Sequence, residues 1–257
     1  MKKQTLLLAV ILIAFALPLF AQVGIADSVV KYITLGDALS AKRDHEGASN
    51  AYLTAINFDP NNYEAHYKAG DEYTEIADRL DLKHQKESYF VQARTLCEKA
   101  IEINPDGWEG HFRLSVALGR LAIFRGGKEK IKLSKMVKAE ADKAVELNPN
   151  ADLAYHVLGR WHQNLANLSS ILKVFAKVLY GGVPPGSNEE SVAMFKKAIE
   201  INPNHIEHHL ELARTYKYMG EKELMREPLE KVLSLPAVEE DDPKFKEEAK
   251  EMLKKLK

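Results

Sequence analysis

The clearest pattern of hydrophobic and polar positions along this chain is a helix ending that recurs four times. The segments AINFDPN, AIEINPD, AVELNPN and AIEINPN occupy residues 55–61, 100–106, 144–150 and 198–204. In each of them an apolar run stops at a proline, which cannot continue a helix without losing a backbone hydrogen bond. Self-similarity of this kind predicts an array of helical repeats.

A second recurring pattern lies upstream of the helix endings. A large residue is followed three positions later by a pair such as Leu-Gly, and then by another large residue about one helical turn further on. The pattern starts at Tyr32, His66, His111, Tyr155 and His209. It resembles the first helix of a tetratricopeptide repeat, where small residues let two helices approach closely. We therefore predict an all-α fold: a right-handed superhelical array of five tetratricopeptide-like helix pairs with insertions and a C-terminal capping helix.

The repeats differ in length. Repeats two, three and four carry about 11, 10 and 20 extra residues between their helices. Insertions in a repeat array collect on one face, which is often the binding face. After the last repeat, Asp241-Asp242-Pro243 predicts a helix start, and the apolar side of residues 244–257 predicts a helix that caps the array.

The N-terminal residues form a separate segment. Lys2 and Lys3 precede an apolar run from Thr5 to Phe20, and the chain then becomes polar. This order predicts a signal peptide over residues 1–21, a single tetratricopeptide domain over 22–257, and export, in a bacterium to the periplasm. Leu19 stands where cleavage prefers a small residue, so an uncleaved membrane anchor formed by residues 5–20 is the alternative.

Composition excludes several classes of function. The chain has 36 Lys and Arg against 37 Asp and Glu, which argues against a nucleic-acid-binding surface. Its single cysteine, Cys97, excludes an internal disulfide and a multi-cysteine metal site. His205, His208 and His209 share a helix face, but His209 occupies a packing position of the repeat, so we predict no metal site. No phosphate-binding glycine loop or nucleophile elbow is present, and we predict neither enzyme activity nor a cofactor.

The first helices of such repeats line a concave groove, and repeat spacing identifies the residues that face it. The predicted groove residues are Tyr67, Asp71, Phe112, Arg120, His156, Arg160, Gln163, Asn164, Arg214 and Lys217. The four basic residues of this set suit a carboxylate or phosphate, because arginine can hold either with two parallel hydrogen bonds. The alternative is that the arginines pair with neighbouring acidic residues on a solvated helix face.

The insertion of the fourth repeat is amphipathic. Leu168, Ile171, Leu172, Phe175 and Leu179 follow helical spacing, with Lys173 and Lys177 on another side. Such a helix either lies on a lipid surface, closes over an apolar ligand, or packs back on repeats three and four. A basic run in the third repeat, from Arg125 to Lys138, either meets anionic lipid or is a solvated face.

A more specific resemblance covers roughly residues 130–253. It rests on Leu158-Gly159-Arg160-Trp161, the insertion ending Val178-Leu179-Tyr180-Gly181, Glu189-Glu190, and Phe195-Lys196-Lys197-Ala198. These segments resemble the regulator of microtubule dynamics family, which consists of helical-repeat proteins, several with an N-terminal hydrophobic anchor. Eukaryotic members associate with microtubules, and one tethers organelles through a repeat domain that handles phospholipids. The sequence thus predicts a scaffold for a protein or peptide partner, with phospholipid or small apolar-ligand binding and transfer as the alternative.

Overall fold

The computed structural model describes residues 24–256, and this part of the chain contains helices and no strands. The predicted signal peptide or anchor lies outside the described residues. No helix within residues 24–256 is long and apolar enough to cross a bilayer. The helices are a segment over residues 24–40, α2 (His45–Phe58), α3 (Tyr63–Arg79), α4 (Lys83–Ile103), α5 (Trp108–Ala122), α6 (Gly127–Leu147), α7 (Asp152–Ala166), α8 (Ser170–Tyr180), α9 (Asn188–Ile201), α10 (Ile206–Met219), α11 (Lys222–Ser234) and α12 (Asp242–Lys254).

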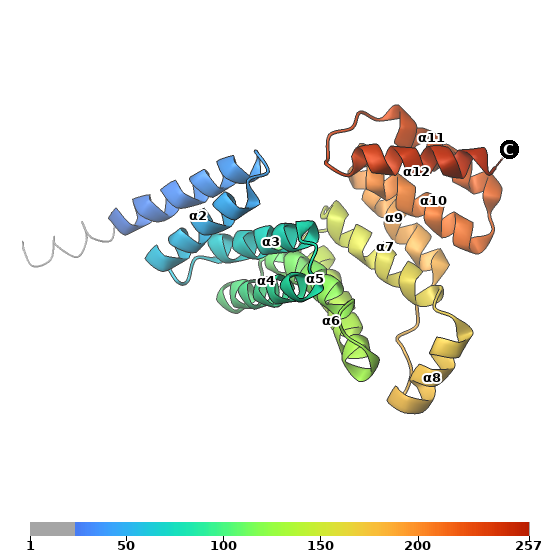
Figure 1. Ribbon diagram of the computed structural model, residues 1–257, viewed down its shortest axis with the longest axis horizontal. Helices are drawn as coiled ribbons and strands as arrows, with labels where there is room; N and C mark the ends of the chain where they lie inside the picture. The colour runs from blue at the N-terminus through green and yellow to red at the C-terminus, as the bar shows by residue number, and fades with distance from the viewer. Residues whose placement is uncertain (1–23, 257) are drawn as a thin grey trace, which may run out of the picture. The chain divides into compact units, whose positions relative to one another are not determined.

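The helices form the five predicted pairs (Figure 1). The helix over 24–40 packs on α2 through Val29, Ile33 and Tyr52. The other pairs are α3 with α4, α5 with α6, α7 with α9, and α10 with α11, and α12 covers the last pair as the predicted cap. The all-helical repeat class is therefore confirmed.

The chain divides into two compact units, the first ending at Pro105 and the second starting at Asp106. The first unit holds the helices up to α4, and the second holds α5 to α12. One core of the second unit gathers Phe195, Leu210 and Leu229, which are completely buried, between α9, α10 and α11. Ala249 and Met252 of α12 join this core, which explains why the capping helix is amphipathic.

The insertions take two different forms. In repeats two and three the extra residues are helical and lengthen the second helix, so that α4 and α6 each have 21 residues. The expectation that they would form a separate insertion between the helices is wrong for these two repeats. In repeat four the extra residues fold into a helix of their own, α8, between α7 and α9.

Small residues set the distance between paired helices. A Cβ atom added at Gly159 of α7 would lie 2.8 Å from the ring of Phe195 on α9, closer than carbon atoms can approach. Gly36 and Gly70 meet Tyr52 and the Cys97 sulfur in the same way. In repeats one, two and four, the glycine of the first helix therefore makes room for the larger residue of the second helix.

We expect Gly159→Ala to lower the free energy of unfolding by about 1–3 kcal/mol, because the new methyl group overpacks the buried Phe195 ring. Gly119→Ala is the matched control: its Cβ would lie 3.9 Å from Val137, an ordinary contact, and alanine favours the helix by up to about 1 kcal/mol. Urea unfolding followed by circular dichroism measures both. Equal stability of the two variants would contradict this account of the helix spacing.

Candidate functional site

Two of the predicted groove residues lie in the first unit, on α3. Tyr67 is half-buried, and its ring lies 5.0 Å from that of Tyr63. Asp71 is also half-buried, and its charge contributes, after burial and the hydrogen bond to Asp37, to raising the pKa of Tyr52. Helix α3 carries five acidic residues and two basic ones, so the predicted acidic character of the second repeat is present.

The other eight predicted residues lie in the second unit, and three of them are buried. Phe112 packs with Ala144, Ala151 and Ala154 in a small core. His156 and Gln163 are 7% and 6% exposed, and both hydrogen-bond to side chains of α10. These three side chains hold helices together. Arg160 and Arg214 are partly exposed, and Asn164 and Lys217 are exposed.

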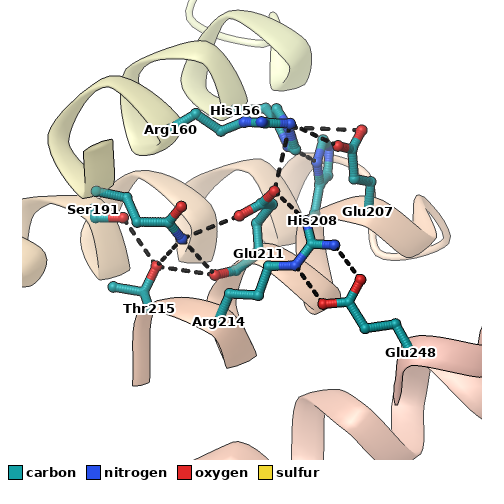
Figure 2. Close-up of polar contacts among 10 residues, drawn as sticks. His156, Arg160, Ser191, Glu207, His208, Glu211, Arg214, Thr215 and Glu248 are labelled. Carbon is teal, nitrogen blue, oxygen red and sulfur yellow. Dashed lines mark hydrogen bonds and ion pairs between the residues drawn. The ribbon is translucent and has the colours of Figure 1, made fainter. Parts of the chain in front are cut away.

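The centre of the site is a buried carboxylate, that of Glu211 on α10. Its side chain is 2% exposed, and one oxygen, Oε1, accepts from Arg214 Nη1 at 2.6 Å and lies 3.4 Å from Arg160 Nη1 (Figure 2). Arg160 Nη1 also donates to Glu207 at 3.1 Å. One acidic group thus joins two of the arginines that repeat spacing predicts on one wall. We call Arg160, Glu207, Glu211, Arg214 and Glu248 the ion-pair cluster.

Arg214 also connects the cluster to the capping helix. Its Nε donates to Glu248 Oε1 of α12 at 2.9 Å, and its Nη2 donates to the other oxygen of the same carboxylate. Burial opposes the charge of Arg214, but the bonds to Glu248 and Glu211 outweigh it and raise its pKa. The Arg214 bond holds the pKa of Glu248 below its usual value. Most donors of Arg214 are therefore occupied within the chain.

A second set of bonds fixes the other oxygen of Glu211. Gln163 of α7 donates to Glu211 Oε2 at 3.1 Å and to Thr215 Oγ1 at 2.9 Å. Thr215 and Ser191 hydroxyls lie 3.1 Å apart, and both residues are completely buried. Because buried polar groups are costly without partners, this network fixes α7, α9 and α10 in one arrangement.

Asp152, His208 and His156 form a chain of hydrogen bonds in which the two histidines are buried and Asp152 is partly exposed. His208 Nε2 lies 3.1 Å from Asp152 Oδ2, and His208 Nδ1 lies 2.9 Å from His156 Nδ1. The carboxylate can only accept, so His208 carries its proton on Nε2 and, when neutral, accepts at Nδ1 from His156. Asp152 therefore sets the tautomer of both rings.

Burial determines the charge of these groups. Burial lowers the pKa of His156 well below its usual value, and the positive charges of Arg160 and Arg214 act in the same direction. Burial also lowers the pKa of His208, although the bond to Asp152 opposes this. Burial raises the pKa of Glu207, and Arg160 and Arg120 act against that rise. Both histidines are thus neutral at pH 7 in the folded protein.

The segment Leu158-Gly159-Arg160-Trp161 has a separate role for each residue. Leu158 is buried, Gly159 makes room for Phe195, and Arg160 binds the acidic residues of α10. Trp161 donates from its indole N–H to the Ser134 carbonyl on α6 at 2.7 Å. The motif therefore connects α7 to three other helices.

The remaining chemically distinctive residues have structural partners. His209 Nε2 lies 2.8 Å from the Pro203 carbonyl, and Cys97 is completely buried. Within residues 24–256, no group of three or more His, Cys, Asp or Glu side chains is arranged to hold a metal ion.

The part of the ion-pair cluster that a ligand can reach is the exposed side chain of Arg160. Arg160 contacts Glu207 and Glu211 through a single nitrogen, Nη1, and 40% of its side chain is exposed. Asn164 follows Arg160 by one turn on α7, and Lys217 follows Arg214 by about one turn on α10. Arg160 can therefore bind an anionic group, while Arg214 is bonded to Glu211 and Glu248 and stabilises the contact between α10 and α12.

Sequence reasoning missed the acidic half of the site. Glu211 and Arg214 are three residues apart on one helix, a spacing that brings side chains together, so this pair was detectable. Asp152 and His208 are 56 positions apart, and Glu248 lies beyond the last repeat, so no local pattern indicates their contacts.

The helix pairs and their packing define a helical repeat protein of the tetratricopeptide class. A tetratricopeptide protein of Thermus thermophilus is similar in structure, with a TM-score of 0.64 at 16% identity over 88% of this chain and 98% of that chain. PilF of Pseudomonas aeruginosa has a TM-score of 0.58 at 15% identity over 91% and 93% of the two chains. At these identities the likeness shows the fold.

Residues 33–257 match the family described as regulator of microtubule dynamics protein 1-3, and the chain belongs to this family. The resemblance inferred from residues 130–253 is thus confirmed and extends to the first repeat. Regulator of microtubule dynamics protein 1 of Bos taurus is 29% identical over 67% of this chain and 55% of its own length. The protein of the same name from Caenorhabditis elegans is 29% identical over 66% and 76%. The chain spans about half the length of the mammalian relatives it matches.

We expect Arg214→Met to lower the free energy of unfolding by about 3 kcal/mol, because it leaves the buried Glu211 carboxylate with weaker partners. Arg160→Met should cost only about 1 kcal/mol, since Arg160 is more exposed and its contacts are longer. Arg226→Met, which removes an exposed pair with Glu230 at 4.0 Å, is the control and should have little effect. If Arg160→Met were as costly as Arg214→Met, the assignment of Arg214 to the fold would be wrong.

We also expect the melting temperature to fall as the pH is lowered from 7.5 to 5.5. His156, His162, His208 and His209 have lowered pKa values when folded, so below pH 6.5 the unfolded chain binds more protons and stability declines. Glu207, whose pKa is raised, acts in the opposite direction. The decrease should be at least about 3 °C, because 1 kcal/mol corresponds to roughly 2–4 °C in a chain of this size.

Circular dichroism melts at the two pH values measure this difference. His208→Asn, which keeps a donor for Asp152 but does not titrate, should reduce it. A melting temperature that is equal or higher at pH 5.5 would show that the buried histidines do not control stability in this range.

Proposed function

We propose that this protein is a non-catalytic scaffold, exported or anchored in a membrane, that binds a segment of a protein partner along its first helices. The observation that carries the proposal is Arg160, a half-exposed guanidinium that uses one nitrogen for Glu207 and Glu211. Because it is already held by the buried cluster, Arg160 loses little side-chain freedom when it binds a carboxylate.

Charge supports an anionic group on the partner. Arg120, Arg160 and Lys217 stand on the first helices of three successive repeats, α5, α7 and α10. Glu211 is shared between Arg160 and Arg214, and Glu248 binds Arg214, so Glu207 is the acidic group of the ion-pair cluster that binds Arg160 and not Arg214. A C-terminal carboxylate or an acidic side chain of a peptide suits such a surface.

The names of the relatives associate them with microtubule dynamics. We propose that this chain shares their repeat domain and has a different partner, since a chain exported on the basic and apolar segment at residues 2–20 would not meet tubulin.

The second candidate function is binding and transfer of a phospholipid or another small apolar ligand. It is favoured by the apolar side chains that α8 exposes to solvent. We place it second because the polar cluster on α7 and α10 offers hydrogen-bonding groups that an acyl chain does not need.

We expect a photo-crosslinking side chain at Asn164 to capture one defined protein in cells of the source organism, and the same side chain at Leu224 of α11 to capture none. Both positions are exposed, so the crosslinker does not disturb the fold. Arg160→Gln should reduce capture at Asn164 at least about tenfold, because one charged hydrogen bond contributes roughly 1.5–3 kcal/mol. Charge reversal at Arg214 is unsuitable, since it breaks the bonds to Glu211 and Glu248.

Capture that is equal at Asn164 and Leu224, or unchanged by Arg160→Gln, would overturn the groove assignment. Native mass spectrometry of the same preparation distinguishes the second candidate. One phospholipid retained per chain, with no crosslinked protein, would favour a carrier over a scaffold.

A further inference from the structure

Helix α8 exposes most of its apolar side chains to solvent. Ile171, Leu172, Val174, Phe175, Val178 and Leu179 are 55–77% exposed, and Ala176 is the buried residue of the helix. At 100° per residue these six side chains span an arc of about 160° on one face. A contiguous apolar patch of this size marks an interaction surface. The packing of the insertion onto repeats three and four, one of the sequence-based alternatives, is limited to the opposite face.

This face belongs to a well-formed helix with a defined attachment. Ser169 caps its start by accepting from the Leu172 N–H at 3.3 Å, and Gly181 ends it in the left-handed conformation with φ 79°. Lys173 donates to the Ala166 carbonyl at 2.7 Å. The helix is therefore held from its polar side, and its apolar side points away from these contacts.

Basic residues lie beside the helix, at the start of α6. A Cβ added at Gly127 would lie 2.7 Å from the hydroxyl of Tyr180, so the end of α8 touches the start of α6 (Figure 1). From that point α6 presents four exposed lysines, Lys128, Lys130, Lys132 and Lys135. At 100° per residue, Lys128, Lys132 and Lys135 share one side of α6 and Lys130 lies on the other. The one acidic residue among them, Glu129, is paired with Arg125 at 2.9 Å.

Positive charge is concentrated in the start of α6 and in the insertion that contains α8. Residues 125–138 and 167–186 contain eight basic residues and one acidic residue, which leaves 28 basic and 36 acidic residues in the rest of the chain. An apolar helix face without any acidic residue, next to a cluster of lysines, is complementary to a bilayer that contains anionic phospholipid. None of the six residues that form the exposed arc has a hydrogen-bonding side chain, which suits the acyl region of a bilayer.

We propose that α8 inserts its apolar face into the headgroup boundary of an anionic membrane while the lysines of α6 contact the lipid phosphates. Six large side chains provide the apolar area, and the lysines select anionic lipid. This surface is separate from the ion-pair cluster of α7 and α10, so the protein can hold a partner while it lies on a membrane.

The test is cosedimentation of the full chain with vesicles of phosphatidylcholine containing 30% phosphatidylglycerol, compared with pure phosphatidylcholine. We expect binding to the anionic vesicles that weakens at least tenfold in high salt or on pure phosphatidylcholine. Val178→Asp with Phe175→Asp should reduce binding at least tenfold, and Lys128→Glu with Lys132→Glu should remove the preference for anionic vesicles. Val238→Asp with Leu224→Asp, at exposed apolar positions outside α8, is the matched control and should bind normally.

A second measurement detects insertion of α8 directly and does not rely on a variant that loses vesicle binding. In Phe175→Trp, the added indole should shift its fluorescence to the blue when anionic vesicles are added, because it enters the bilayer. Absence of vesicle binding by the wild type, or binding unaffected by Val178→Asp with Phe175→Asp, would overturn the proposal. A concentration-dependent dimer that Val178→Asp abolishes, without vesicle binding, would instead assign the face to a second copy of the chain.

Discussion

The burial of one carboxylate, that of Glu211, constrains the second unit more than any other interaction. A carboxylate that is 2% exposed must be paired and hydrogen-bonded, because an isolated buried charge is too costly to keep. Its two oxygens are satisfied by Arg160 and Gln163 of α7 and by Arg214 of its own helix. Arg214 then requires Glu248 of α12, so one buried charge specifies how three helices meet. Apolar packing alone tolerates sliding of one helix along another, whereas this network is satisfied in one register.

The two arginines of the ion-pair cluster, Arg160 and Arg214, differ in how they are bound. Arg214 is bound by Glu211 and Glu248 through three nitrogens, while Arg160, one repeat earlier, contacts Glu207 and Glu211 through Nη1 and has a side chain that is 40% exposed. Pairing with neighbouring acidic residues, one of the two sequence-based interpretations, holds for both arginines. The anion site stays a prediction, and Arg160 is the more exposed candidate for it. The difference in exposure follows from α12, which supplies Glu248 to Arg214, whereas the acidic partners of Arg160 come from α10.

Most of the fold could be predicted from the sequence because the same spacing of small residues, large residues and prolines recurs in several repeats. The proline endings, the small residues such as Gly159 and the large ones such as Phe195 each fix a helix or a contact. The lengths of α4 and α6 could not be predicted, since nothing in the extra residues distinguishes a loop from an earlier helix start. Burial of Phe112, His156 and Gln163 was also missed. The spacing rule that selects groove residues gives only the direction in which a side chain leaves its own helix. It takes no account of a neighbouring helix that covers the side chain.

Two histidines show how neighbouring repeats are joined. His66 Nε2 lies 3.0 Å from the carbonyl of Pro60, and His209 Nε2 lies 2.8 Å from that of Pro203. In both cases a first helix reaches back six residues and donates to the proline that closes the previous repeat. Each bond links the end of one repeat to the first helix of the next and adds about 1 kcal/mol against opening of that corner. The two corners are therefore held by a side chain as well as by the backbone loop between the helices.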